Sequence, residues 1–149
     1  MSVSNEEIRE RLNKALVEGV QVQSVYDDGA KIKHLALLEC ALYLTYDRGI
    51  EDSAAKSISA LFAREELTVE KKGKNGSVQQ DIIPMIRRLA VRRESGNILV
   101  LEALICCQNP SLNPMQIAAA IQTYLPENAP DFVRCRRLEL YDVNETIFR

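Results

Sequence analysis

Two long apolar segments, each interrupted by a single glutamate, constrain the fold of this chain more than any other feature. The first runs from Ala30 to Tyr46 around Glu39, and the second runs from Ile98 to Cys107 around Glu102. A helix that is hydrophobic on all sides has no polar face to turn to water and must be buried. Interpreted as helices, the two segments predict a core built around two central helices.

Helical spacing and capping signals predict five further helices. Ser4 and Glu7 form a capping box ahead of the first, which we expect to end at Gly19, and Pro114 lies at the first turn of another, where proline is favoured. With the two apolar segments included, the predicted helices cover residues 4–19, 30–46, 52–67, 81–94, 98–107, 113–125 and 131–138. The sequence therefore predicts an all-α fold, a single-domain bundle of about seven helices over residues 1–149.

Two segments fall outside these helices. Residues 70–78, which contain the polar run KKGKNGS, are predicted to form a flexible loop. The alternative is the tip of a β-hairpin, because Asn75-Gly76 favours a tight turn. Residues 139–149 are predicted to form a short extended arm, either a strand or a tail packed on the body of the protein or on a partner.

A shift of 63 residues lays residues 34–62 on residues 97–125 and brings Glu39 onto Glu102. Each matched segment reads as an apolar helix followed by a turn and a second helix. The overlay predicts two pseudo-repeated helical hairpins that pack on one another.

Charge and cysteine content exclude several classes of protein. With 19 basic and 21 acidic residues, the net charge of −2 gives no overall attraction to phosphates. The four cysteines lack the Cys-x-x-Cys spacing of zinc ligands, and His34 is the only histidine. We expect reduced thiols, no metal, no cofactor and a cytoplasmic location, since the polar N-terminal segment has no apolar h-region and no stretch reaches the roughly 20 apolar residues of a membrane span.

Glu39 and Glu102 need a partner, because an ionised carboxylate among apolar residues is costly unless it is paired. We expect each to lie at the wet edge of its helix or to pair with an arginine such as Arg88, Arg92 or Arg134. A carboxylate pair for acid–base or metal chemistry is the alternative, and a pocket that holds both residues would favour it. The chain has no phosphate loop, nucleophile elbow or metalloprotease motif, so we expect that it is not an enzyme.

Arginines gather on the helices predicted at 81–94 and 131–138, and apolar residues follow in the terminal arm. Residues 98–137 also resemble a helix-turn-helix or winged-helix layout in pattern. We expect a non-catalytic interaction or regulatory protein that binds a protein partner and self-associates as a homodimer. The alternative is a nucleic-acid-binding regulator that uses the arginines, together with Lys71, Lys72 and Lys74, on phosphates. The residues predicted to contact the partner are Arg87, Arg88, Arg92, Arg134, Arg136, Arg137, Tyr141, Val143, Ile147 and Phe148.

Overall fold

The computed structural model describes residues 2–149, which divide into two compact units. One unit extends through Ile32 and includes Arg149, and it contains helix α1 (Asn5–Ala15). The hydroxyl of Ser4 accepts a hydrogen bond from the backbone N–H of Glu7 at 3.1 Å, as the capping prediction requires. The helix ends at Ala15 and so is shorter than the sequence suggests.

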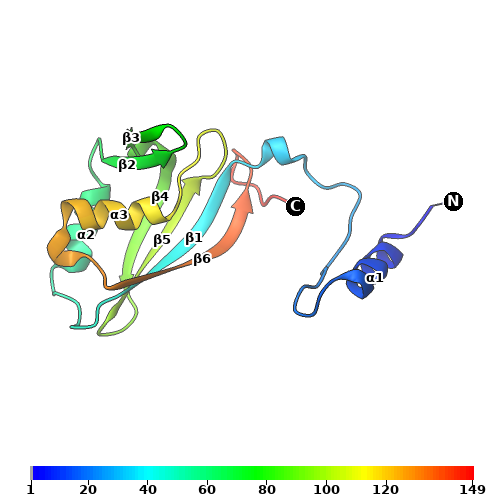
Figure 1. Cartoon of the computed structure of the whole chain (residues 1–149), viewed down its shortest axis with the longest axis horizontal. Coiled ribbons are helices and arrows are strands. Elements are labelled where there is room, and N and C mark those ends of the chain that lie inside the picture. The colour runs from blue at the N-terminus through cyan, green and yellow to red at the C-terminus, as the bar shows by residue number, and fades with distance from the viewer. Residues whose placement is uncertain (1) are drawn as a thin grey trace. The chain divides into compact units, whose positions relative to one another are not determined.

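The other unit, Lys33–Phe148, is mixed α/β, so the prediction of an all-α bundle was wrong (Figure 1). Four strands form one antiparallel sheet in the order β4-β5-β1-β6, and β2 and β3 form a separate hairpin. Without that hairpin, the succession is β-α-β-β-α-β, the split arrangement of ferredoxin-like folds. The elements are β1 (Leu37–Thr45), α2 (Ala54–Phe62), β2 (Thr68–Gly73), β3 (Gly76–Asp81), β4 (Ile86–Arg93), β5 (Ile98–Cys106), α3 (Met115–Tyr124) and β6 (Phe132–Tyr141), with 3-10 turns at Ile32–His34, Ile83–Met85 and Pro126–Asn128.

The two apolar segments that were predicted as central helices are the two central strands, β1 and β5. They pair along their full length, from Leu37 opposite Cys106 to Thr45 opposite Ile98. Several side chains of these strands that face away from the helices are also apolar and buried, such as Ala41, Val100 and Leu104, so the hydrophobic pattern alone does not separate the strands from buried helices. Leucine and alanine favour helices locally, and the pairing partners of the sheet override that preference.

The arginine-rich helices predicted at 81–94 and 131–138 are the edge strands β4 and β6. Each contains a β-bulge, at Arg87 in β4 and at Leu138 in β6, where the pairing register shifts by one residue. An extra residue breaks the alternation of apolar and polar side chains that identifies a strand. The pattern therefore did not identify either segment as a strand. The helix-turn-helix layout predicted over residues 98–137 is also wrong, because that range contains β5, α3 and most of β6.

The overlay matched two segments of similar structure, but the helical hairpins predicted for them are wrong. Each of the two overlaid segments is a strand followed by a helix, β1 with α2 and β5 with α3, rather than a helical hairpin. The repeated β-α unit is the building block of the observed topology.

Residues 70–78, which were predicted to form a flexible loop, belong to a β-hairpin, the alternative that the sequence also allowed. Strands β2 and β3 pair from Thr68 opposite Asp81 to Gly73 opposite Gly76. The turn is Lys74-Asn75, one residue earlier than expected, and Gly76 follows it with a φ of 116°. A residue with a side chain is strained at such an angle, so glycine allows the chain to close here.

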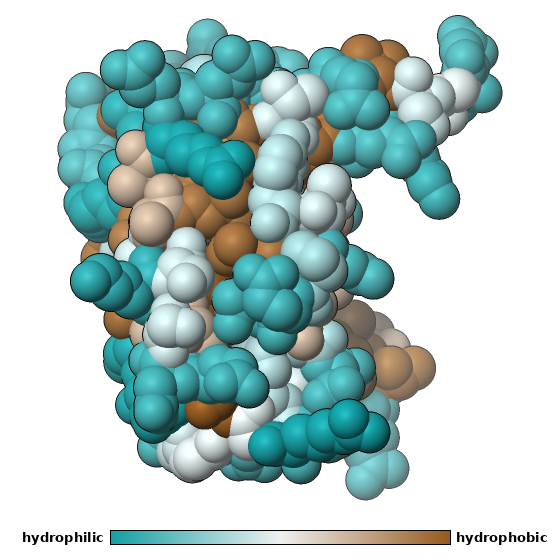
Figure 2. Space-filling view, turned by 90° about the vertical axis from the view of Figure 1, so that its left-hand side faces the viewer, coloured by the Kyte–Doolittle hydropathy of each residue, from teal (hydrophilic) through white to brown (hydrophobic). Residues whose placement is uncertain are grey.

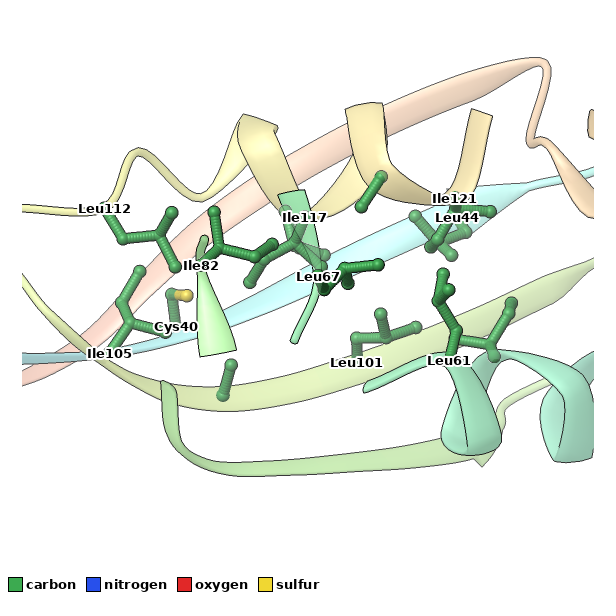
Figure 3. Close-up of a cluster of buried hydrophobic side chains, with 14 of the residues drawn as sticks. Cys40, Leu44, Leu61, Leu67, Ile82, Leu101, Ile105, Leu112, Ile117 and Ile121 are labelled. Carbon is green, nitrogen blue, oxygen red and sulfur yellow. The ribbon is translucent and has the colours of Figure 1, made fainter. Parts of the chain in front are cut away.

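Helices α2 and α3 and the β2-β3 hairpin pack on one face of the four-stranded sheet. Figure 3 shows Leu44 and Leu101 of the sheet pointing toward Leu61 of α2 and toward Ile117 and Ile121 of α3. Each of these five side chains is almost fully buried.

On the face of the molecule drawn in Figure 2, hydrophobic side chains reach the surface as a brown area bordered by hydrophilic ones. Within residues 2–149, no helix is both long enough and apolar enough to cross a membrane.

Replacement of Leu101 by alanine is expected to lower the free energy of unfolding by about 2–5 kcal/mol, because it leaves a cavity between the sheet and α3. Leu101 is 0% exposed, whereas Leu138 on the edge strand is 42% exposed. Leu138→Ala is the matched control and should cost about 0.5 kcal/mol or less. Urea unfolding followed by far-ultraviolet circular dichroism compares the two, and equal losses would contradict the placement of the core.

Candidate functional site: the open face of the sheet

The face of the sheet opposite the helices, which we call the open face, carries charged side chains together with apolar and aromatic ones. In antiparallel strands, directly paired residues point to the same side, and alternate residues along each strand share it. Register therefore places residues of all four strands together on this face. Its central members are Arg88, Ala90, Arg92, Val100, Glu102, Leu104, Glu39, Ala41, Tyr43, Arg134 and Arg136.

The charges on the open face are ordered across the strands. Arginines occupy both outer strands, two on β4 and two on β6. Glu39 and Glu102 lie on the central strands, and a third carboxylate, Glu139 of β6, lies directly opposite Glu39. The floor between them is apolar, since Val100 and Leu104 are 0% and 2% exposed. Along the stretch of β6 that carries Arg134 and Arg136, the result is a positive–negative–positive pattern over a hydrophobic floor.

The β4 arginines are paired with carboxylates. Arg88 contacts Glu145 at 2.7 Å, and Arg92 contacts Glu102 at 3.3 Å and Glu94 at 3.7 Å. These side chains are roughly half exposed, where an ion pair stabilises a fold by about 1 kcal/mol or less. A binding partner can therefore exchange them for contacts of its own at small cost.

On β6, the guanidinium of Arg134 lies over the ring of Tyr43, 4.7 Å from its centroid. This cation–π contact covers the tyrosine and holds the arginine flat against the sheet. Together with the buried floor, it makes this half of the open face smooth.

A groove of about 460 Å³ crosses the β4 half of the open face. Its lining includes Glu39, Glu102, Arg88, Ala90 and Leu104. The groove thus holds the two glutamates that the sequence singled out, because they lie on neighbouring strands with side chains on the same face. Its walls offer groups of both charges, and its floor is apolar.

Each of the two glutamates already has a hydrogen-bond donor. Glu102 accepts from Arg92, in agreement with the expected arginine pairing. Glu39 accepts from the hydroxyl of Tyr141 at 2.8 Å, a partner that the sequence did not suggest. This hydrogen bond to the ionised carboxylate raises the pKa of Tyr141 above its ordinary value, because it stabilises the neutral phenol.

The structure brings together five of the ten predicted contact residues on the open face: Arg88, Arg92, Arg134, Arg136 and Tyr141. Arg87 is the bulged residue of β4 and lines a different hollow with Ser59 and Phe62 of α2. Arg137 is paired with Cys40, on the side of the sheet that carries the core.

The arm predicted at 139–149 begins inside β6 and continues as a tight turn. Asp142 accepts hydrogen bonds from the backbone of Asn144 and Thr146, each at 2.9 Å, and Tyr141 pairs with Ile147. Val143 and Ile147 are exposed, whereas Phe148 is half-buried and its N–H donates to Leu140.

Sequence reasoning missed Tyr43, Ala90 and Leu104. Their alternation with core residues, such as Leu42 and Leu44 on either side of Tyr43, was the only signal available. That signal has meaning once the segment is known to be a strand.

Among residues 2–149, no group of three or more His, Cys, Asp or Glu side chains is placed to hold a metal ion. The site is a shallow, mixed-charge surface on an antiparallel sheet of ferredoxin-like topology. The chain belongs to the family described as "Uncharacterized protein conserved in bacteria (DUF2344)", whose model matches residues 1–114. That match includes β1, β4 and β5 and stops before β6. No curated protein and no solved structure matches the chain.

Replacement of Glu39 by glutamine is expected to lower the pKa of Tyr141 toward its ordinary value of about 10, because the charged acceptor is lost. In the wild-type protein the folded pKa is the higher one. The hydrogen bond therefore stabilises the fold below about pH 10, and this contribution disappears as the pH rises through the folded pKa.

Phenolate absorbance of wild type minus that of Tyr141→Phe isolates this group. Burial, with the nearby charge of Asp131, raises the pKa of Tyr46 to about 12, and Glu39 has no part in this shift, so the Tyr46 titration serves as an internal reference. An unchanged Tyr141 titration in Glu39→Gln would contradict the contact.

Proposed function

We propose that this protein is a non-catalytic protein-binding module that docks a partner on the open face of its sheet. The observation that carries the proposal is the charge order of that face, with arginines on both outer strands and Glu39 and Glu102 between them over an apolar floor. A partner surface with a basic group flanked by acidic groups complements this order. Apolar atoms that are still exposed there, those of Ala90 and of the arginine stems, would supply affinity once water is displaced.

The same charge order disfavours a nucleic acid, the alternative function. A phosphate backbone that runs from the β4 arginines to the β6 arginines must pass over both central carboxylates. The carboxylates beside the β4 arginines, Glu145, Glu94 and Glu102, would also repel that backbone. Neutralisation of phosphates by unpaired basic groups is the main source of affinity for nucleic acids.

The size of the open face suits a protein interface. Four strands about 4.8 Å apart and about nine residues long at about 3.4 Å each give a flat area of about 600 Å² before the relief of side chains is added. Stable interfaces use roughly 800 Å² of accessible surface from each partner. The flat area is about three quarters of that figure, so the face, with the relief of its side chains, suits a partner interface at the lower end of the usual range.

The expected self-association gains no support from this face. A two-fold axis that packs two open faces together puts the central carboxylates of one copy over those of the other. It also puts arginine strands over arginine strands, and like charges at a desolvated interface oppose binding. We therefore propose a partner of different sequence. A cytoplasmic site of action belongs to the proposal, because the four cysteines are free and suit a reducing compartment.

Photo-crosslinking from position 90 tests the proposal. Ala90 is exposed in the middle of β4 and lines the groove, so a photoreactive side chain there meets whatever covers the open face. In bacterial cells that express the full chain, we expect protein adducts from position 90. The same probe at Gln122, exposed on α3, should give none of these adducts.

Glu102→Lys reverses the central charge and should reduce the adducts from position 90 at least tenfold while circular dichroism stays unchanged. Adducts that disappear on nuclease treatment would contradict the proposal and favour the nucleic-acid alternative. Equal protein adducts from positions 90 and 122 would show nonspecific contact and would also contradict it.

Acid–base chemistry between Glu39 and Glu102 is a second candidate, favoured by the groove that holds both carboxylates. It ranks lower because Tyr141 and Arg92 already occupy these side chains. A small-molecule adduct at position 90 without any protein adduct would support this candidate over the first.

A further inference from the structure

Strand β6 is an outer strand of the sheet and offers an unpaired backbone edge. Its inner side pairs with β1 along its length. At Leu140 the C=O accepts from the N–H of Phe148 at 2.8 Å, so the end of the chain covers the edge there. From Phe132 to Leu138, no backbone hydrogen bond within residues 2–149 reaches the outer side of the strand. An edge of this kind is a template for another strand.

Three arginines stand on this exposed stretch: Arg134 and Arg136 on the open face, and Arg137 on the opposite side. None of them takes part in a salt bridge within residues 2–149, and the contact of Arg134 with the Tyr43 ring leaves its charge without a carboxylate partner. Two copies of β6 that paired with each other would bring arginines side by side, and like charges on neighbouring strands are destabilising. The edge is thus blocked against its own copy and remains available to a segment of opposite charge.

We propose that the β6 edge between Phe132 and Leu138 binds an extended acidic segment of the protein partner as a fifth strand. Backbone hydrogen bonds of strand addition supply the affinity, and side chains at alternate positions supply the specificity. Asp or Glu at every second position of the segment falls beside Arg134 and Arg136, because both arginines point to the same face. The inference rests on the proposed function, since it states the chemical class of that partner.

Binding of a synthetic peptide to the full chain tests the inference. The probe is a capped, fluorescent peptide of roughly eight residues that alternates Glu and Thr, long enough to span the open part of the edge. Fluorescence polarisation should show saturable binding. Arg134→Glu with Arg136→Glu should weaken it at least tenfold, while Lys71→Glu with Lys72→Glu, an exposed basic pair on β2, should leave it within about twofold.

Two further probes separate strand addition from simple charge attraction. A peptide of equal charge with proline in place of each threonine lacks the backbone donors and should bind at least tenfold more weakly. Equal binding of the proline peptide would overturn the inference. A single-stranded oligothymidylate that binds more tightly than the Glu-Thr peptide, and is lost in the same arginine variant, would overturn it in favour of nucleic acid.

Failure of this experiment and failure of the proposed function are distinguishable. No peptide binding alongside protein adducts at position 90 would reject the fifth strand and retain the open face as a docking surface. Peptide binding without those adducts would reject the open face and retain the edge as an independent site.

Discussion

The full-length pairing of β1 with β5 is the constraint on which the rest of this structure depends. The two strands are central, so each is paired on both sides, and their inward side chains form the surface on which α2 and α3 pack. A slip of one residue in either strand would turn every core side chain outward and would drive Glu39 or Glu102 into the core. The two glutamates thus oppose wrong registers, because a buried carboxylate without a partner is costly.

The outer strands follow from that central pair and solve a different problem. An exposed edge invites uncontrolled pairing, and edge strands are protected by charged residues and bulges. Both β4 and β6 have a bulge and several arginines. The same arginines make the surface selective, since they repel a second copy of the chain and attract acidic groups. Protection against aggregation and recognition of a partner can therefore share one set of side chains.

The open face and the β6 edge meet at Arg134, Arg136 and Tyr141. Tyr141 ties β6 to the central glutamate of β1, and Glu145, a few residues further on, reaches Arg88 on the far strand. The last residues of the sequence thus connect both outer strands of the sheet. A partner that engages this end of the open face would exchange weak, half-exposed ion pairs for its own, which favours reversible binding over a permanent complex.

Local signals in the sequence determined the helices α1, α2 and α3, the start of α1 at Ser4 and the gathering of arginines in two segments. Helical periodicity and capping act over a few residues, so they are readable without knowledge of the fold. The overlay of residues 34–62 on 97–125 also found the repeated unit, although its first element was taken for a helix. Only the tertiary structure decided that Ala30–Tyr46 and Ile98–Cys107 contain strands, because a strand with apolar residues on both of its faces shows no clear alternation. It also decided that Glu39, Glu102 and four arginines share one face, since strand register joins residues that are distant in sequence and leaves no local trace.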